Sequence, residues 1–323
     1  MAKAKAKAKR KAKIRPASPR TAKAKGDGGA RRSFQPYSQI GEEQRVHIDL
    51  VREIEAKRGR NLICYFGSSR RAEGTITQDD ATAIENLLGY LALNDYDCKL
   101  DILLQSRGGS ATAAERIILT CRNFCSDFEV IVANFAMSAA TLIAMGSDRI
   151  TMSNTAVLGP IDPQMVYDTG SGRVVRSATS VVNAYQELIE ETQKAIIAKQ
   201  PPQPYLQLLN KMEPSWVQEC KLARSLGKGI ACEHLALHML KSKTKRQVAQ
   251  VVEHFLEEGE KHTHGRPISA AKASEFGLEV EIIPHDDDLW KLIWELFMRC
   301  ETHVDNQRLA KYFVCRRNTL LVK

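Results

Sequence analysis

The sequence predicts an α/β fold in which helices cover a largely parallel sheet. Two short apolar segments, residues 62–66 and 99–105, have the length and composition of buried strands. Segments with helix-start residues and helical apolar spacing follow both of them. Strands that alternate with helices in this way are typical of parallel sheets, because parallel neighbours need a crossover connection.

In the first half of the chain, each element is predicted by its apolar spacing. Helices show apolar residues three and four positions apart, whereas buried strands are short apolar runs. The expected helices cover residues 42–57, 77–91, 111–124 and a run that ends near 145, and the expected strands cover 62–66, 99–105, 129–134 and 149–152.

Beyond Pro163 the pattern becomes mainly helical. A long amphipathic helix is expected over 177–199, and Pro201 and Pro202 end it. The later elements are a helix-rich segment to residue 258, a helix over 268–278, a strand over 279–283 and a helix over 288–300. We therefore expect three parts, which are a disordered basic tail over 1–40, an α/β domain over 41–285, and a C-terminal helix with a basic end over 286–323.

The positive charge of the chain is concentrated at its start. Residues 1–32 contain thirteen Lys and Arg and one Asp, a charge of +12, which leaves −3 of the total of +9 for the rest. A general basic binding face on the folded part is therefore not expected. The tail is expected to be a solvated, solubilising segment or, as the sharper alternative, a non-specific contact to nucleic acid or anionic membrane lipid.

The eight cysteines form no Cys-x-x-Cys pair and no dense framework. Such usage is expected in a reducing compartment. The chain also has neither an apolar run long enough to span a bilayer nor the apolar stretch of a secretory signal. These features predict a cytoplasmic protein.

The pair Gly108 and Gly109 stands where a predicted strand turns into a helix. Acyl transfer needs backbone N–H groups aimed at the developing oxyanion, and glycines let the backbone approach a ligand closely. The turn could therefore supply an oxyanion hole. The alternative is an ordinary tight turn in which Ser110 caps the following helix.

Ser138 occupies the equivalent position one strand and one helix later. Its small neighbours Ala136, Ala139 and Ala140 would let a peptide chain approach the hydroxyl. Ser138 is thus a candidate nucleophile. The alternative is a serine that only caps its helix.

Taken together, these motifs resemble a known superfamily. The order is a strand, Ser-Arg-Gly-Gly-Ser at 106–110, a helix, a strand, Ala-Met-Ser-Ala-Ala-Thr at 136–141, a helix, and Leu-Gly-Pro-Ile-Asp-Pro-Gln at 158–164. This order is similar to that of the Clp/crotonase superfamily, and more closely to the serine dehydrogenase proteinase family, relatives of signal peptide peptidase A. The resemblance covers about residues 62–164 and again 267–278.

The resemblance implies a fold, an activity and an assembly. The fold would be a Clp/crotonase-like spiral of β-β-α units with a helical C-terminal extension, usually assembled into oligomers. The serine placed like Ser138 would attack a peptide carbonyl, and the pair placed like Gly108 and Gly109 would stabilise the tetrahedral intermediate. Peptides or proteins would be the substrates, and copies of the chain would be its partners.

The general base is not visible in the sequence. Clp proteases place a histidine about 25 residues after the nucleophile, where this chain has Asp162. Relatives of signal peptide peptidase A use a lysine farther on, for which Lys194 or Lys199 is available, provided that desolvation lowers the pKa of its amine. His264 is a further candidate, since an imidazole needs no such shift. Asp162, Lys199 and His264 are therefore expected as a base or as residues that shape the site.

Three functions compete at this point. The first is a serine peptidase that needs no cofactor, since no zinc-ligand set, phosphate loop or dinucleotide-binding glycine motif is present. The second is a non-catalytic oligomeric scaffold of the same fold, tethered by its basic tail. The third is an acyl-CoA enzyme of the crotonase type, against which the serine at the helix start already argues.

Overall fold

The centre of the molecule is a seven-stranded sheet with the strand order β10-β5-β3-β2-β1-β11-β12. The computed structural model describes residues 40–91, 96–168, 172–256 and 267–323. Neighbouring strands from β1 to β10 run parallel, whereas β11 and β12 are antiparallel to their neighbours. The strands are β1 (Asn61–Gly67), β2 (Lys99–Gln105), β3 (Asp127–Val132), β5 (Arg149–Met152), β10 (Val280–Ile282), β11 (Lys311–Cys315) and β12 (Asn318–Val322).

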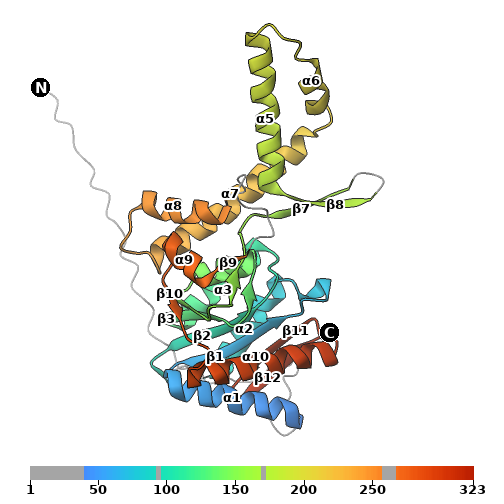
Figure 1. The fold of residues 1–323 in the computed structure, drawn as a ribbon. Coiled ribbons are helices and arrows are strands. Elements are labelled where there is room, and N and C mark those ends of the chain that lie inside the picture. Colours follow the sequence, from blue (N-terminus) through green and yellow to red (C-terminus); the bar gives the residue numbers. More distant parts are fainter. Residues whose placement is uncertain (1–39, 92–95, 169–171, 257–266) are drawn as a thin grey trace, which may run out of the picture. The chain divides into compact units, whose positions relative to one another are not determined.

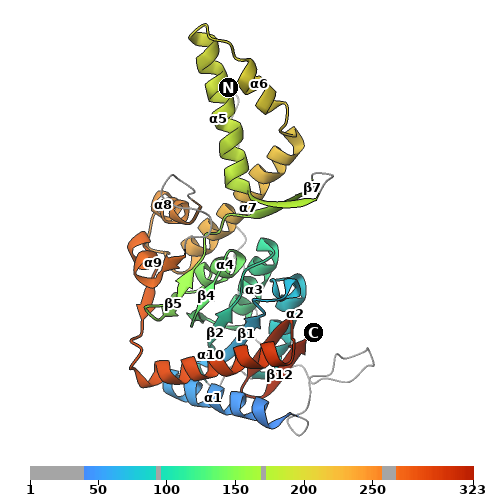
Figure 2. The same ribbon diagram turned by 45° about the vertical axis from the view of Figure 1, so that its right-hand side comes forward.

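Helices cover both faces of this sheet, which explains the apolar strand sequences. Successive side chains of a strand point to opposite faces. Ile63 and Tyr65 accordingly pack in one core with the helices α2 (Gln78–Leu91), α3 (Ala111–Phe124) and α4 (Ala139–Met145). Leu62, Cys64 and Phe66 pack in the other core with α1 (Glu42–Arg58) and α10 (Asp288–Asn306). Figures 1 and 2 show α1 and α10 side by side on their face of the sheet.

A second, smaller sheet lies beside the central one and gives the fold its repeat. It contains β4 (Phe135–Ala136), β6 (Val157–Leu158) and β9 (Ile268–Ser269), and a bridge from Ser106 to Ala136 extends it. A strand of the large sheet, a short segment in the small sheet and a helix thus follow one another twice, as β2, Ser106 and α3, and as β3, β4 and α4. The predicted α/β spiral of β-β-α units is confirmed.

The residues beyond Pro163 form a hairpin and a set of helices. The hairpin consists of β7 (Gln164–Asp168) and β8 (Arg173–Ser177), and the sequence analysis did not predict it. After the hairpin, α5 packs against α6 and α7, and α7 packs against α8. These helices are α5 (Ala178–Ile197), α6 (Gln203–Leu209), α7 (Pro214–Leu237), α8 (Lys245–Leu256) and α9 (Ala270–Phe276), and a 3-10 turn spans Ala72–Gly74.

The end of the chain belongs to the central sheet. The sequence predicted a helix and a basic end over residues 286–323, and the helix is present as α10. The basic end forms β11 and β12, and β11 pairs with β1. All described residues lie in a compact unit that spans residues 34–323. The predicted tail over 1–40 lies outside the described residues, except for Ile40.

Candidate active site

Ser138 stands at the turn between β4 and α4 in an uncommon backbone conformation. Its dihedral angles are φ 53° and ψ −116°, and its hydroxyl makes no capping hydrogen bond to α4. Positive φ is costly for a residue with a Cβ, and it persists only where the surroundings enforce it. Ser138 is also half-buried as a residue.

Three other serines show what an ordinary capping serine looks like in this protein. Ser110, Ser177 and Ser269 precede α3, α5 and α9 with extended backbones, and each hydroxyl accepts a hydrogen bond from an N–H of the first helical turn. Ser138 differs in both conformation and bonding. The interpretation of Ser138 as a capping serine is therefore wrong, whereas the capping role of Ser110 is confirmed.

Gly108 packs directly against this turn. It has φ 98°, and a Cβ added to it would lie 2.5 Å from the carbonyl oxygen of Met137 and 2.8 Å from the Cβ of Ser138. Only glycine fits such an approach without a shift of the backbone. The structure thus brings together the two motifs that the sequence analysis singled out, although 30 residues separate them.

Gly109 is held from the opposite side by Ile76, the residue that bridges to it. The N–H of Ile76 donates to the carbonyl of Gly108 at 2.8 Å, and the N–H of Ser110 donates to the carbonyl of Ile76 at 3.0 Å. A Cβ on Gly109 would lie 2.4 Å from both the nitrogen and the oxygen of Ile76. Sequence reasoning missed Ile76, because only the fold places it beside the glycines.

The N–H groups at the two turns differ in their hydrogen bonds. The N–H of Gly108 donates to Ser106 Oγ at 3.0 Å, and that of Ala140 donates to the carbonyl of Met137 at 3.0 Å. Within the described ranges, by contrast, the N–H groups of Gly109 and Ala139 have no hydrogen-bond acceptor. Two N–H groups at adjoining turns are therefore available to an oxygen of a substrate.

Asp162 lies in the segment that follows β6, and its side chain anchors the start of α5. The carboxylate is fully buried, and its Oδ1 accepts hydrogen bonds from the N–H of Thr179, at 3.0 Å, and from the hydroxyl of Thr179. The segment reaches the Ser138 turn at Gly159, whose carbonyl accepts a bond from Thr141 Oγ1 at 2.9 Å. The observed partner of the Asp162 carboxylate is thus Thr179.

Neither of the lysines suggested as a base lies in an apolar environment. Lys194 is exposed and pairs with Glu191 at 2.6 Å, and the hydrogen bond and charge of Glu191 raise the pKa of its amine. This is opposite to the shift that a neutral general base requires. Lys199 is exposed after the end of α5. Since a helix rises 1.5 Å per residue, Lys199 is about 30 Å along α5 from Thr179, the partner of Asp162.

The histidines leave the base unassigned as well. His264 lies outside the described residues. His234 and His238, four residues apart, have pKa values lowered chiefly by burial, that of His238 to about 4. Among the described residues, no group of three or more potential ligands could hold a metal ion.

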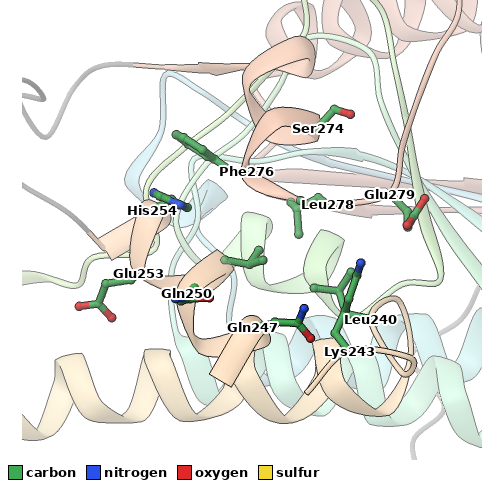
Figure 3. A pocket seen from close by; sticks show the side chains of 12 residues that line it. Leu240, Lys243, Gln247, Gln250, Glu253, His254, Ser274, Phe276, Leu278 and Glu279 are labelled. Atoms are coloured by element: carbon green, nitrogen blue, oxygen red, sulfur yellow. The ribbon is translucent and has the colours of Figure 1, made fainter. Parts of the chain in front are cut away.

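A separate cavity opens between α8 and α9, away from these turns. It has a volume of about 730 Å³, and Figure 3 shows its mixed lining, with the charged side chains of Lys243 and Glu279 and the rings of His254 and Phe276. These two rings stack with their centroids 4.6 Å apart. Neither Ser138 nor Gly108 nor Gly109 lines this cavity.

The fold is that of an α/β protein built from β-β-α units, in which the turns of Gly108 and Ser138 meet. The family model of the ClpP-like SDH-type serine proteinases matches residues 34–197, half of the chain. The chain therefore belongs to this family of serine dehydrogenase-type proteinases, as the sequence analysis predicted.

Individual relatives are more distant. Two uncharacterized proteins of Methanocaldococcus jannaschii are each 27% identical to the chain, one over 240 residues, which cover 71% of this chain and 70% of the relative. The other matches over 257 residues, which cover 76% and 77%. A solved structure of a mutant of the 1510-N membrane-bound stomatin-specific protease has 18% identity and a TM-score of 0.37, and the match covers 70% of this chain and 80% of that one. Among the described residues, no helix is long and apolar enough to cross a membrane.

Proposed function

We propose that this family member is an active serine peptidase in which Ser138 Oγ attacks the carbonyl carbon of a peptide bond. The observation that carries the proposal is the conformation of Ser138. A residue with positive φ is held at the meeting point of two turns, and within the described ranges its hydroxyl has no hydrogen-bond partner. Strain of this kind concentrates at functional sites.

The neighbouring turns supply the electrostatic part of the reaction. Attack by Ser138 Oγ creates a tetrahedral intermediate whose oxygen carries the negative charge. The N–H groups of Gly109 and Ala139 would donate to this oxygen, while Gly108 permits the close approach of the two turns. Collapse of the intermediate breaks the C–N bond, the amine leaves with a proton, and water then hydrolyses the serine ester.

The proton of the Ser138 hydroxyl must pass to a base that the described residues do not identify. His264 remains a candidate from the sequence. Lys199 of the same subunit is disfavoured by its exposure and by its distance along α5, and Asp162 fits a shaping role through its bonds to Thr179. Because no general base is identified among the described residues, a scaffold of the same fold without turnover is the second candidate function.

Covalent labelling separates these two functions. A serine-directed fluorophosphonate should label the wild type at Ser138, and the Ser138→Ala variant should not be labelled. Ser269→Ala is the matched control, because it removes a hydroxyl that caps α9 and leaves Ser138 intact. Equal labelling of wild type and Ser138→Ala would exclude Ser138 as the nucleophile, and absence of labelling in all three proteins would favour the scaffold.

The remaining proposals concern partners and location. We propose peptides or unfolded segments as substrates and copies of the chain as partners, as is typical of ClpP-like proteases. A cytoplasmic location agrees with the eight cysteines, none of which forms a disulfide bond in the structure. Whether residues 1–32 contact nucleic acid or anionic membranes is decided by comparing retention on DNA and on anionic liposomes with and without them.

A further inference from the structure

A buried charged cluster lies next to the residue that holds Gly109. Lys311 on β11 and Asp80 on α2 are 4% and 2% exposed. The amine of Lys311 donates to both carboxylate oxygens of Asp80, at 2.8 and 2.7 Å, and to Thr77 Oγ1 at 3.0 Å. The hydroxyl of Tyr65 donates to Asp80 Oδ2 at 2.7 Å. The cluster therefore joins β1, α2 and β11.

The cluster fixes the backbone immediately before α2. The N–H of Thr77 donates to Asp80 Oδ2 at 2.7 Å, and the N–H of Asp80 donates to the carbonyl of Thr77 at 3.1 Å. Thr77 follows Ile76, whose N–H and carbonyl bond to the residues on either side of Gly109. An unbroken chain of hydrogen bonds and one peptide link thus leads from Lys311 to the Gly109 loop.

Stability alone does not explain a buried ion pair in this position. Removing two charges from water is costly, and apolar side chains of similar volume often serve a fold equally well. What a fully bonded pair supplies is a fixed direction for the groups that it contacts. Here the contacted main chain is that of Thr77, which follows Ile76, and Ile76 bonds to the residues on either side of Gly109.

We propose that Lys311 is a positioning residue for the oxyanion hole. Through Asp80 and Thr77 it holds Ile76 in place, and Ile76 sets the direction of the Gly109 N–H. The inference deepens the proposed peptidase function and rests on it for its catalytic part. It also gives the C-terminal hairpin, β11 and β12, a role in the chemistry of Ser138.

The same hairpin offers a matched control. Arg316 directly follows β11, and its guanidinium donates to Glu55 at 2.9 Å and to Asn61 at 2.7 Å in another buried pair. A further bond runs from its Nη2 to the carbonyl of Leu91 at the end of α2, whereas Lys311 bonds at the start of that helix. Lys311→Met and Arg316→Met therefore each break a buried pair of the same hairpin, but only the first should loosen the Gly109 loop.

Two measurements on the full chain test the inference. Amide hydrogen exchange reports local opening, and we expect peptides that cover residues 74–80 and 106–111 to exchange about tenfold faster in Lys311→Met than in Arg316→Met. Inactivation by a fluorophosphonate should show a maximal rate about tenfold to a hundredfold lower in Lys311→Met, because misplaced oxyanion donors weaken the transition state. Its inhibition constant should stay within about twofold, and Arg316→Met should keep both constants.

The outcomes distinguish this inference from the function on which it rests. Unchanged exchange over 106–111 in Lys311→Met overturns the positioning role, and so does faster exchange with an unchanged inactivation rate. If the wild type is not labelled at all, the peptidase proposal fails, and hydrogen exchange alone decides whether Lys311 positions the loop. Should Lys311→Met fail to fold, the variant that combines it with Asp80→Asn removes both charges, and the same two outcomes apply to it.

Discussion

Two regions of the molecule differ in how closely their atoms meet. At the turns of Gly108 and Ser138, a single added Cβ would lie within 2.5 to 2.8 Å of neighbouring atoms. Helix α6 buries none of its residues, and Ile197 at the end of α5 is 82% exposed. Close packing fixes the position of every atom, whereas exposed surfaces accept change. The difference teaches that close main-chain packing surrounds Ser138, whereas α6 and the end of α5 expose most of their side chains.

The largest effect is expected at Gly108. Gly108→Ala would place a methyl group against Met137 and Ser138 and would also impose a positive φ on alanine. We expect the free energy of unfolding to fall by about 2–4 kcal/mol and labelling of Ser138 to fall at least about a hundredfold. Urea unfolding and fluorophosphonate labelling measure the two effects.

Gly229 provides the control for that substitution. It lies in α7, and a Cβ added there would meet nothing within 4 Å. Gly229→Ala should raise the free energy of unfolding by up to about 1 kcal/mol, because alanine favours helices more than glycine does. If the two variants unfold at the same urea concentration, the close packing around Gly108 does not determine the cost of an added methyl group.

Acid should destabilise the protein through His47, a fully buried residue of α1 whose ring contacts those of His303 on α10 and Tyr312 on β11. Burial, followed by the charge of His303, lowers the pKa of His47 to about 4. The unfolded chain binds this proton near pH 6.5 and the folded chain only near pH 4, so stability falls as the pH drops between these values. At about 1.4 kcal/mol per pH unit, we expect a loss of about 2–3 kcal/mol from pH 7 to pH 4.5.

The variant His47→Gln isolates this contribution. Its free energy of unfolding, measured by urea titration at both pH values, should fall by about 2 kcal/mol less than that of the wild type. Helices α5 and α6 should contribute no such pH dependence, because residues 178–209 contain no histidine. An equal pH dependence in wild type and variant would show that His47 does not titrate as its burial implies.

A smaller difference is expected between two serines at helix starts. Ser110→Ala removes a capping hydroxyl and should cost about 1 kcal/mol. Ser138→Ala removes a hydroxyl that caps nothing and should change stability by less than about 0.5 kcal/mol, although it abolishes labelling. Thermal unfolding of both variants checks this, and a larger loss for Ser138→Ala would contradict the hydrogen-bond assignment.

The smallest effect belongs to α6. Leu206 is 43% exposed, and Leu206→Ser should change the free energy of unfolding by no more than about 0.5 kcal/mol. Its effect on assembly is a separate readout, because exposed apolar residues can form contacts between subunits. Sedimentation of wild type and variant at matched concentrations would show whether this surface takes part in an oligomer.

The parts of the fold that could be predicted from the sequence are those whose burial shows as an unbroken run of apolar residues. Strands β1 and β2 are buried on both faces, so their runs of apolar residues identify them directly. Gly108 and Ser138 could be selected because glycine and serine are chemically suited to such turns. The positive φ of Ser138 could not be predicted from its neighbours in sequence, and the glycine that packs against its turn lies 30 residues earlier.

Other elements depend on partners that the sequence does not place nearby. Lys311 and Arg316 gave the C-terminal end a basic appearance, yet their charges are neutralised by Asp80 and Glu55, more than 200 residues away. Asp162 was selected for its separation from Ser138 along the sequence, and only the structure shows that its side chain bonds to Thr179. Charge pairing across such separations cannot be recognised from local composition.

The pairing of β1 with β11 also has a consequence for the order of events in synthesis. Lys311 and Asp80 are 231 residues apart, so a growing chain presents Ser138, Gly108 and Gly109 long before it can form this pair. A ribosome-bound chain that lacks residue 311 would carry the proposed nucleophile without the proposed support of the Gly109 loop. Contacts of such long range also form slowly. Competence for cleavage would then arise only late, after most of the catalytic region has left the ribosome.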